Sequence, residues 1–142
     1  MPVVDIGMST VSVPAGWQET SRTEDTVCLE SVDGKEQATL SVMHFASDAT
    51  FEHFKRMCDL RYESEKEFLT DGFITPETPR PFTHGRVFGM FFSGGDKATG
   101  RVFSEYFSLL RRELLAIYLE GFAPAEATLE SFKAFVAGLR RG

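Results

Sequence analysis

The segment from Arg86 to Phe122 constrains the fold more than any other part of the sequence. It predicts three consecutive strands with apolar residues on both faces, because successive side chains of a strand point to opposite sides. The first of these strands carries apolar residues at both sets of alternate positions: Val87, Phe88, Met90, Phe91 and Phe92. Segments 102–110 and 114–122 repeat this pattern. We therefore expect a sheet that is covered by other elements on both sides.

Two amphipathic helices are predicted to supply that cover. The first runs from Asp48 to about Leu69, with Ser47 and Asp48 as capping residues. Its apolar residues recur at steps of three and four: Phe51, Phe54, Cys58 and Tyr62. The second helix begins with Pro124 at its first position. Its apolar residues have the same spacing: Leu129, Phe132, Val136 and Leu139.

Further strands are expected in the first third of the chain. Residues 4–13 predict an N-terminal strand that bends near Gly7, and residues 26–32 and 35–45 predict a hairpin. Asp33-Gly34 between them is the favoured two-residue turn, in which both residues need a positive φ. Asp71-Gly72 closes the helix, and residues 75–81, which contain three prolines, predict an extended connector after it. Residues 93–100 predict a mobile polar loop.

These elements predict an α+β fold. The expected architecture is an α/β/α sandwich with a mainly antiparallel sheet of about six strands and one helix on each face. The length of 142 residues favours a single domain over residues 1–142.

Composition and charge exclude several classes of function. The net charge of −6 argues against non-specific binding to nucleic acid and against docking on anionic membranes. The sequence shows neither a signal peptide nor an apolar stretch long enough to insert into a membrane. The chain is therefore expected in the cytoplasm, or in the periplasm if a leader peptide has been removed.

No residues form a catalytic or metal-binding signature. The histidines His44, His53 and His84 lack the spacing of metal ligands, and Cys58 lies on the apolar stripe of its helix. Two free thiols, Cys28 and Cys58, are favoured over a disulfide. We therefore expect a protein that is not an enzyme and that needs neither a metal nor another cofactor.

Five residues are candidates for a partner-binding site, in a sheet too wide for one helix per face to cover. Phe103, Glu105 and Phe107 share one face of a predicted strand, while Asp96 and Lys97 lie in the predicted loop before it. A carboxylate between two phenylalanines indicates either an acid with a raised pKa or a solvated part of the sheet that the covering helix leaves open. Glu120 on the next strand is the carboxylate that would pair with Glu105 in acid–base chemistry, but the solvated interpretation is favoured.

The segment Val11-Ser12-Val13-Pro14-Ala15-Gly16-Trp17 carries a family resemblance. A strand that ends in Val-Pro-x-Gly-Trp, followed by strands, a helix, strands and a terminal helix, resembles the DcrB/PsbP-like superfamily. This resemblance implies an α/β/α sandwich and a non-enzymatic binding role. One bacterial branch comprises adaptors of type VI secretion effectors with a C-terminal Trp-containing segment, where this chain has Phe132 and Phe135. Trp17 itself is expected to be a packing residue.

The hypothesis that follows is a protein-binding module with an apolar sheet surface. Its partner would be a secreted effector or toxin, which makes the chain a bacterial adaptor or immunity-type protein. The alternatives are a carrier of an apolar small molecule and a homodimeric structural protein.

Overall fold

A computed structural model describes residues 2–69, 72–85, 87–122 and 125–141. Ten strands and two helices lie within these residues. In chain order they are β1 (Val3–Ile6), β2 (Ser9–Ser12), β3 (Trp17–Arg22), β4 (Thr26–Ser31), β5 (Glu36–His44), α1 (Phe51–Phe68), β6 (Gly72–His84), β7 (Val87–Asp96), β8 (Arg101–Leu110), β9 (Glu113–Gly121), α2 (Ala125–Ala137) and β10 (Leu139–Arg141).

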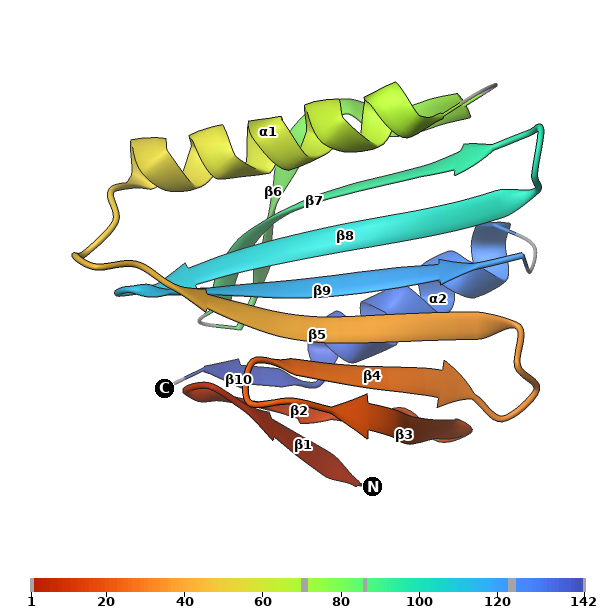
Figure 1. Cartoon of the computed structure of the whole chain (residues 1–142), viewed down its shortest axis with the longest axis horizontal. Coiled ribbons are helices and arrows are strands. Elements are labelled where there is room, and N and C mark those ends of the chain that lie inside the picture. Colours follow the sequence, from red (N-terminus) through yellow and green to blue (C-terminus); the bar gives the residue numbers. More distant parts are fainter. Residues whose placement is uncertain (1, 70–71, 86, 123–124, 142) are drawn as a thin grey trace.

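The strands form two antiparallel sheets. The large sheet has seven strands in the order β3-β4-β5-β9-β8-β7-β6, and the small sheet has three in the order β1-β2-β10 (Figure 1). The β5–β9 pair brings the first half of the chain against the last third, with Leu40 opposite Ile117. The predicted α+β class with a mainly antiparallel sheet is therefore confirmed, but the expected single sheet of about six strands is not.

Two clusters of buried side chains hold the layers together. The α2 cluster joins Phe132, Phe135 and Val136 of α2 to apolar side chains of β4, β5, β9 and the small sheet. The α1 cluster consists of Phe54, Cys58, Tyr62, Met90, Phe92, Phe103, Phe107 and Leu114. Alternate residues of β9 enter different clusters, as the two-faced pattern of its sequence requires.

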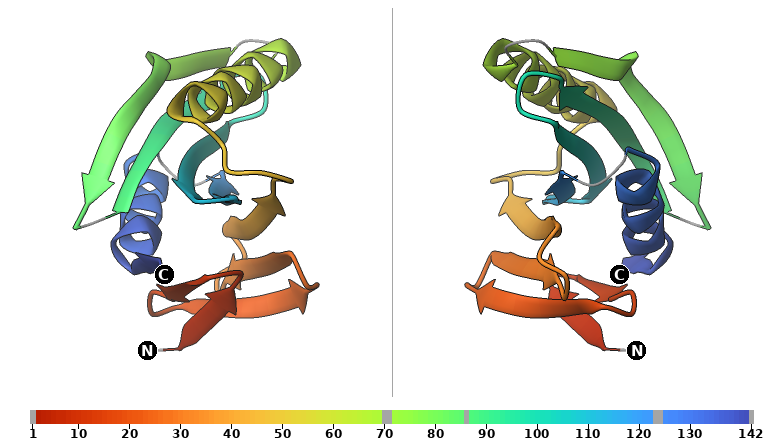
Figure 2. Two further views of the ribbon diagram at one scale, coloured as in Figure 1. Left: turned by 90° about the vertical axis from the view of Figure 1, so that its left-hand side faces the viewer. Right: turned by 90° about the vertical axis from the view of Figure 1, so that its right-hand side faces the viewer.

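The small sheet explains why one helix on each face is an incomplete description of the layers. Val4 and Val11 of its hairpin and Leu139 of β10 belong to the α2 cluster, so this sheet covers part of the large sheet beside α2 (Figure 2). The predicted single strand over residues 4–13 is instead a hairpin, β1 and β2. Gly7 adopts a φ of +56° at its turn, a conformation that residues with a side chain rarely take.

The proline-rich segment is a strand and not merely an extended connector. β6 pairs with β7 at both of its ends, with an irregularity in the register between Thr75 and Arg80. Proline cannot donate a backbone hydrogen bond, so it is tolerated on an edge strand, and β6 is an edge strand of the large sheet.

Two predicted loops differ from the structure. Asp33 does not have a positive φ, whereas Gly34 does. The Asp33 carboxylate instead accepts hydrogen bonds from the Ser31 hydroxyl at 2.7 Å and the Lys35 N–H at 3.0 Å. The predicted loop over residues 93–100 is shorter than expected, because β7 continues to Asp96 and Gly94 pairs with Phe103 across the ladder.

Helix ends and single residues follow the sequence more closely. α1 has Thr50 as its N-cap, two residues after the predicted Asp48, and the Thr50 hydroxyl accepts a hydrogen bond from the His53 N–H. Trp17 packs edge-on against Phe135 with 4.9 Å between ring centroids, which confirms its packing role. Both cysteines are free thiols. Pro124 and Asp71, predicted at helix ends, lie outside the described residues.

Candidate functional site

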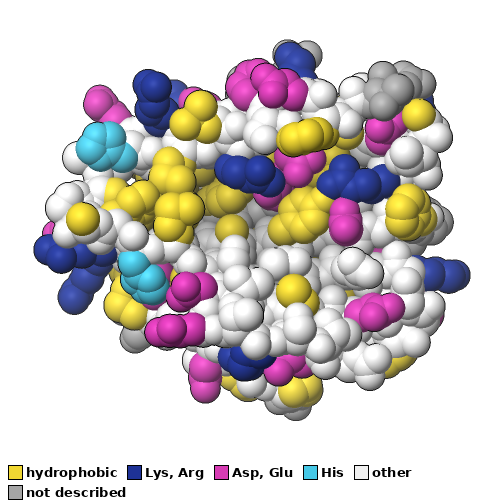
Figure 3. All heavy atoms as spheres, viewed as in Figure 1, with side chains coloured by type: hydrophobic (Ala, Val, Ile, Leu, Met, Phe, Trp, Pro, Cys, Tyr) yellow, Lys and Arg dark blue, Asp and Glu magenta, His cyan; other side chains and the backbone are white. Residues whose placement is uncertain are grey.

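A groove runs between α1 and the strands β8, β9 and β5 of the large sheet. Its volume is about 370 Å³. Hydrophobic side chains gather in the hollow beside α1, and basic and acidic side chains gather next to them (Figure 3). The residues that line it are Thr39, Ser41, Val42, Met43, Met57, Arg61, Glu65, Glu105, Phe107, Leu114, Ala116 and Tyr118.

The groove exists because α1 covers only one part of the sheet. α1 contacts mainly β6 and β7, so the same face of β9 and β5 is left beside the helix rather than under it. The side chains there are small or half-buried: Thr39, Ser41 and Ala116. A sheet much wider than one helix therefore leaves an open floor.

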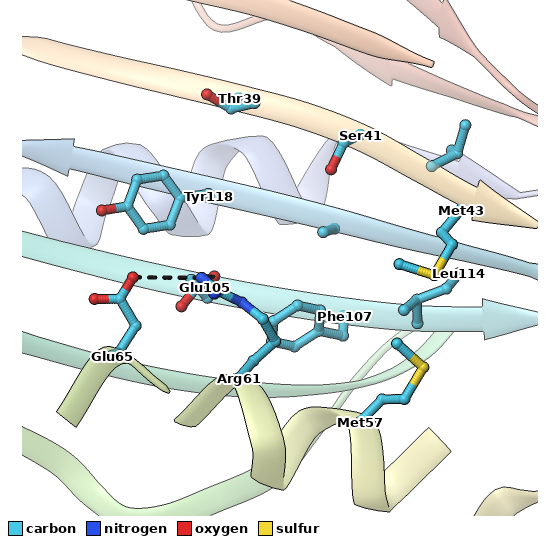
Figure 4. A pocket seen from close by; sticks show the side chains of 12 residues that line it. Thr39, Ser41, Met43, Met57, Arg61, Glu65, Glu105, Phe107, Leu114 and Tyr118 are labelled. Carbon is cyan, nitrogen blue, oxygen red and sulfur yellow. Dashed lines mark hydrogen bonds and ion pairs between the residues drawn. The ribbon is translucent and has the colours of Figure 1, made fainter. Parts of the chain in front are cut away.

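The two ends of the groove differ in chemistry. Met43 of β5, Met57 of α1 and Phe107 and Leu114 of the sheet lie together at one end (Figure 4). Phe107 and Leu114 are buried, whereas Met43 is 50% exposed. Methionine is flexible and polarizable, so two methionines on facing walls can adapt to an apolar group of a ligand.

Charged side chains of α1 and β8 occupy the other end. Arg61 donates through Nη2 to Glu105 Oε1 at 2.8 Å and to Glu65 Oε1 at 3.3 Å (Figure 4). Glu105 is 3% exposed and Glu65 is 9% exposed, whereas the Arg61 side chain is 44% exposed. One solvent-facing cation therefore covers two buried carboxylates.

A second arginine extends this charged end along the sheet. Arg101 Nε donates to Glu120 Oε2 at 2.7 Å, and the Tyr118 hydroxyl donates to the same oxygen at 2.9 Å. Arg101 also contacts the Tyr118 hydroxyl and lies 3.7 Å from Glu65 Oε2. Its guanidinium lies 4.7 Å from the centre of the Phe103 ring. Burial raises the pKa of Tyr118 above its ordinary value, so its hydroxyl remains a donor.

Glu105 is the most perturbed carboxyl of the site. Burial raises its pKa from 4.5 to about 7, against the opposing effect of the Arg61 hydrogen bond. Its Oε2 is buried and has no hydrogen-bond partner among the described residues. The favoured interpretation of Glu105 as a solvated position is therefore wrong, because α1 and Arg61 cover it. The alternative, an acid with a raised pKa, agrees with the structure.

The structure separates the five predicted site residues. Glu105 and Phe107 line the groove. Phe103 is 1% exposed and belongs to the α1 cluster, where its ring stacks on Tyr118. Asp96 is buried and holds the turn after β7 by accepting a hydrogen bond from the Ala98 N–H, and Lys97 is exposed in that turn. Their role in partner binding stays a prediction.

Sequence reasoning missed Arg61 and Glu65. Both follow Phe54 and Cys58 along α1 at steps of three and four residues. The helical period therefore places these two charged residues on the side of α1 that faces the sheet. A charged residue on the apolar stripe of a helix, opposite a charged residue on the apolar stripe of a strand, is the signal that would have found this pair.

Two searches of the described residues gave no sites of other kinds. No cluster of three or more His, Cys, Asp or Glu side chains in this part of the chain is arranged to hold a metal ion. Neither helix, as far as the structure describes them, has the length and apolar character required to cross a membrane.

The chain shares its fold with a cyanobacterial PsbP protein and with the mycobacterial protein LpqN. The chain is similar to the solution structure of the cyanobacterial PsbP protein CyanoP from Synechocystis sp. PCC 6803, with a TM-score of 0.65 and 12% identity over 95% of this chain and 87% of that one. It is also similar to LpqN of Mycobacterium tuberculosis, described as involved in cell envelope biogenesis, with a TM-score of 0.60 and 12% identity over 97% and 88% of the two chains.

A third similar structure comes from Bacteroides thetaiotaomicron. It has a TM-score of 0.56 and 8% identity, and the match covers 95% of this chain but 45% of that one. The chain therefore spans less than half of that protein. No protein-family model matches the sequence, and no curated protein matches it significantly. At these identities the likeness establishes the fold alone.

Proposed function

We propose that this chain is a non-enzymatic protein-binding module whose groove beside α1 receives a segment of another polypeptide. The observation that carries the proposal is the half-open apolar end of the groove, where Met43 remains 50% exposed above the buried Phe107 and Leu114. Exposed apolar surface inside a cleft marks a site for a ligand or a partner.

The open shape of the groove favours a polypeptide over a small apolar molecule. A carrier buries most of its ligand in an enclosed pocket. Here α1 forms a wall on one side, whereas the half-buried Thr39 and Ser41 of β5 form a floor that is open toward solvent. A segment that lies along the groove would keep one side exposed, as a protein partner does.

A substitution at Met43 tests the proposal. Immobilised wild-type chain is used to select binders from a random peptide display library, and the selected peptides are measured by titration. We expect Met43→Asp to weaken binding at least about tenfold, because it places a charge in the apolar end. Leu60→Asp is the matched control, since Leu60 is 58% exposed on α1 and does not line the groove. Peptides that bind both variants equally well, or the absence of any selected peptide, would contradict the proposal.

The more specific role of a bacterial adaptor or immunity-type partner of a secreted effector is part of the proposal and rests on the family resemblance of the sequence. Supporting it is the net charge of −6, which suits a basic partner. Co-purification of a lipid-like molecule, detected by native mass spectrometry, would favour the carrier instead. A dimer in size-exclusion chromatography with light scattering that Met43→Asp dissociates would favour the homodimer.

A further inference from the structure

We propose that the groove selects a segment in which a lysine or arginine accompanies an apolar side chain, with the cation bound by Glu105 and the apolar group held between Met43 and Met57. This inference rests on the proposed function and specifies the chemistry of its partner. The occupant is a basic and apolar segment of another protein.

The unpartnered oxygen of Glu105 is the first observation that supports a cation. Glu105 Oε1 accepts from Arg61, but Oε2 is buried without a donor among the described residues. A buried acceptor that lacks a donor destabilises the structure by the cost of its lost hydration. A bound ammonium or guanidinium group would supply both the missing donor and a compensating charge.

The balance of charge around Glu105 is the second observation. Two cations and three carboxylates meet at this end of the groove: Arg61, Arg101, Glu65, Glu105 and Glu120. With all five ionised the group carries one net negative charge. A cationic side chain would neutralise this excess, whereas an anionic group would increase it.

The exposure of Arg61 provides an approach to the buried carboxylate. Its side chain is 44% exposed, and its contact with Glu65 is longer than its contact with Glu105, 3.3 Å against 2.8 Å. A change of rotamer would let Arg61 keep Glu65 as a partner while it uncovers Glu105. The long side chain of an arginine permits this movement without a change in the backbone.

The register of β8 sets the spacing between the two halves of the ligand. Met43 of β5 is opposite Leu114 of β9, which is opposite Leu109 of β8, so Met43 lies level with a residue four positions from Glu105, about 14 Å along the strand. Two side chains on one face of an extended segment have the same separation at positions i and i+4. We therefore expect the apolar and basic residues of an extended partner to be four positions apart.

The protonation of Glu105 gives this inference a second readout. The charged and titratable groups that face Glu105 are Arg61, Glu65 and Cys58 of α1, Arg101 of β8 and Tyr118 of β9. Because its pKa is about 7, the carboxyl is largely protonated at pH 6 and largely ionised at pH 8. A cation binds the ionised form, so the affinity for a basic peptide rises over this interval.

The experiment compares synthetic peptides made from the sequences selected above. We expect the selected peptides to contain Lys or Arg four positions from Leu, Met or Phe, and to lose at least about tenfold in affinity when that Lys or Arg is replaced by Gln. Glu105→Gln should cause a similar loss and should remove the gain in affinity from pH 6 to pH 8. Glu63→Gln is the matched control, since Glu63 is exposed on α1 and does not line the groove.

The outcomes distinguish this inference from the proposed function. Peptides that lose binding to Met43→Asp but contain no basic residue, or that bind Glu105→Gln as well as wild type, would overturn the inference and leave the protein-binding groove intact. Selection of acidic peptides, or binding of a fatty acid that depends on Arg61, would also overturn it. The replacement of Lys or Arg in the peptide keeps the test valid even if Glu105→Gln unfolds.

Discussion

Glu105 occupies a position that a strand between packed layers would normally give to an apolar residue. It lies between Phe103 and Phe107 on the face of β8 that meets α1, and it is 3% exposed. Its ion pair with Arg61 offsets the cost of burial only in part, because the pKa of the carboxyl is still raised to about 7. Groups whose pKa is shifted by burial beside a cleft are frequent in functional sites.

This raised pKa predicts how stability depends on pH. Between about pH 4.5 and 7 the carboxyl of Glu105 is protonated in the folded protein and ionised in the unfolded chain. The folded state then binds more protons, so the free energy of unfolding falls as pH rises through this interval, by about 3 kcal/mol in total for this group. Urea unfolding of the wild type and of Glu105→Gln at pH 4.5 to 8 measures the effect.

The difference in unfolding free energy between the wild type and Glu105→Gln separates the effect of Glu105 from that of the other titrating groups. The wild type should lose stability relative to Glu105→Gln as pH rises from 5 to 8. Two curves that stay parallel over that range would show that the carboxyl has an ordinary pKa in the folded state.

A buried ion pair links elements from both ends of the sequence. Glu113 at the start of β9 is fully buried and accepts from Arg141 of β10 at 2.7 Å and from the Met8 N–H of the β1–β2 turn at 2.9 Å. His44 at the end of β5 lies 3.1 Å from the same carboxylate. A Cβ on Gly7 would collide with Glu113, so glycine is required there for close packing as well as for its positive φ.

Removal of Arg141 should therefore destabilise the whole molecule. Arg141→Met leaves the buried carboxylate of Glu113 without its cation, which costs about 3 to 5 kcal/mol. Arg140→Met is the control, because Arg140 is exposed, and we expect a change below about 0.5 kcal/mol. Chemical unfolding measures both variants. The double variant Glu113→Gln/Arg141→Met should lose less than the two single losses added together, and simple additivity would argue against a coupled pair.

The elements that the sequence predicted well are those with a regular apolar period. β4, β5, β8, β9 and both helices follow this period, because each buries a continuous face. β6 was not predicted as a strand because proline disfavours strands, and only its place at a sheet edge makes Pro79 and Pro81 compatible with pairing. β10 is three residues long and pairs with β2, which is distant from it in the sequence, so no local sequence pattern predicts it.

The candidate site was predictable on one of its two sides. Glu105 and Phe107 were found because a charge interrupts an apolar stripe in β8. Asp96 was interpreted as a loop residue because glycines precede it, whereas the pairing of Gly94 and Gly95 with β8 extends the strand to Asp96. Arg61 and Glu65 require the position of α1 over the sheet, which depends on how the whole stripe packs and not on any local motif.

At the scale of the whole molecule, β8 and β9 join the two layers. Tyr106 of β8 belongs to the α2 cluster while Phe103 and Phe107 of the same strand belong to the α1 cluster. Loss of either cluster exposes one face of the strands that the other cluster needs. We therefore predict that the chain unfolds as one cooperative unit, as expected for a single domain.

Trp17 makes this prediction measurable. It is the only tryptophan in the sequence, and it contacts Phe135 in the α2 cluster, so its fluorescence reports on that layer.

Phe92→Ala creates a cavity in the α1 cluster, where Phe92 is fully buried against Tyr62, and should cost about 3 to 5 kcal/mol. Because the layers share β8 and β9, the transition seen by Trp17 fluorescence should shift to lower urea by the same amount as the transition seen by far-UV circular dichroism. The contrary result would be a Trp17 transition at its wild-type midpoint together with a second transition, seen by circular dichroism, at lower urea. It would show that the α2 layer folds without the α1 layer and that the groove can open by local unfolding of α1.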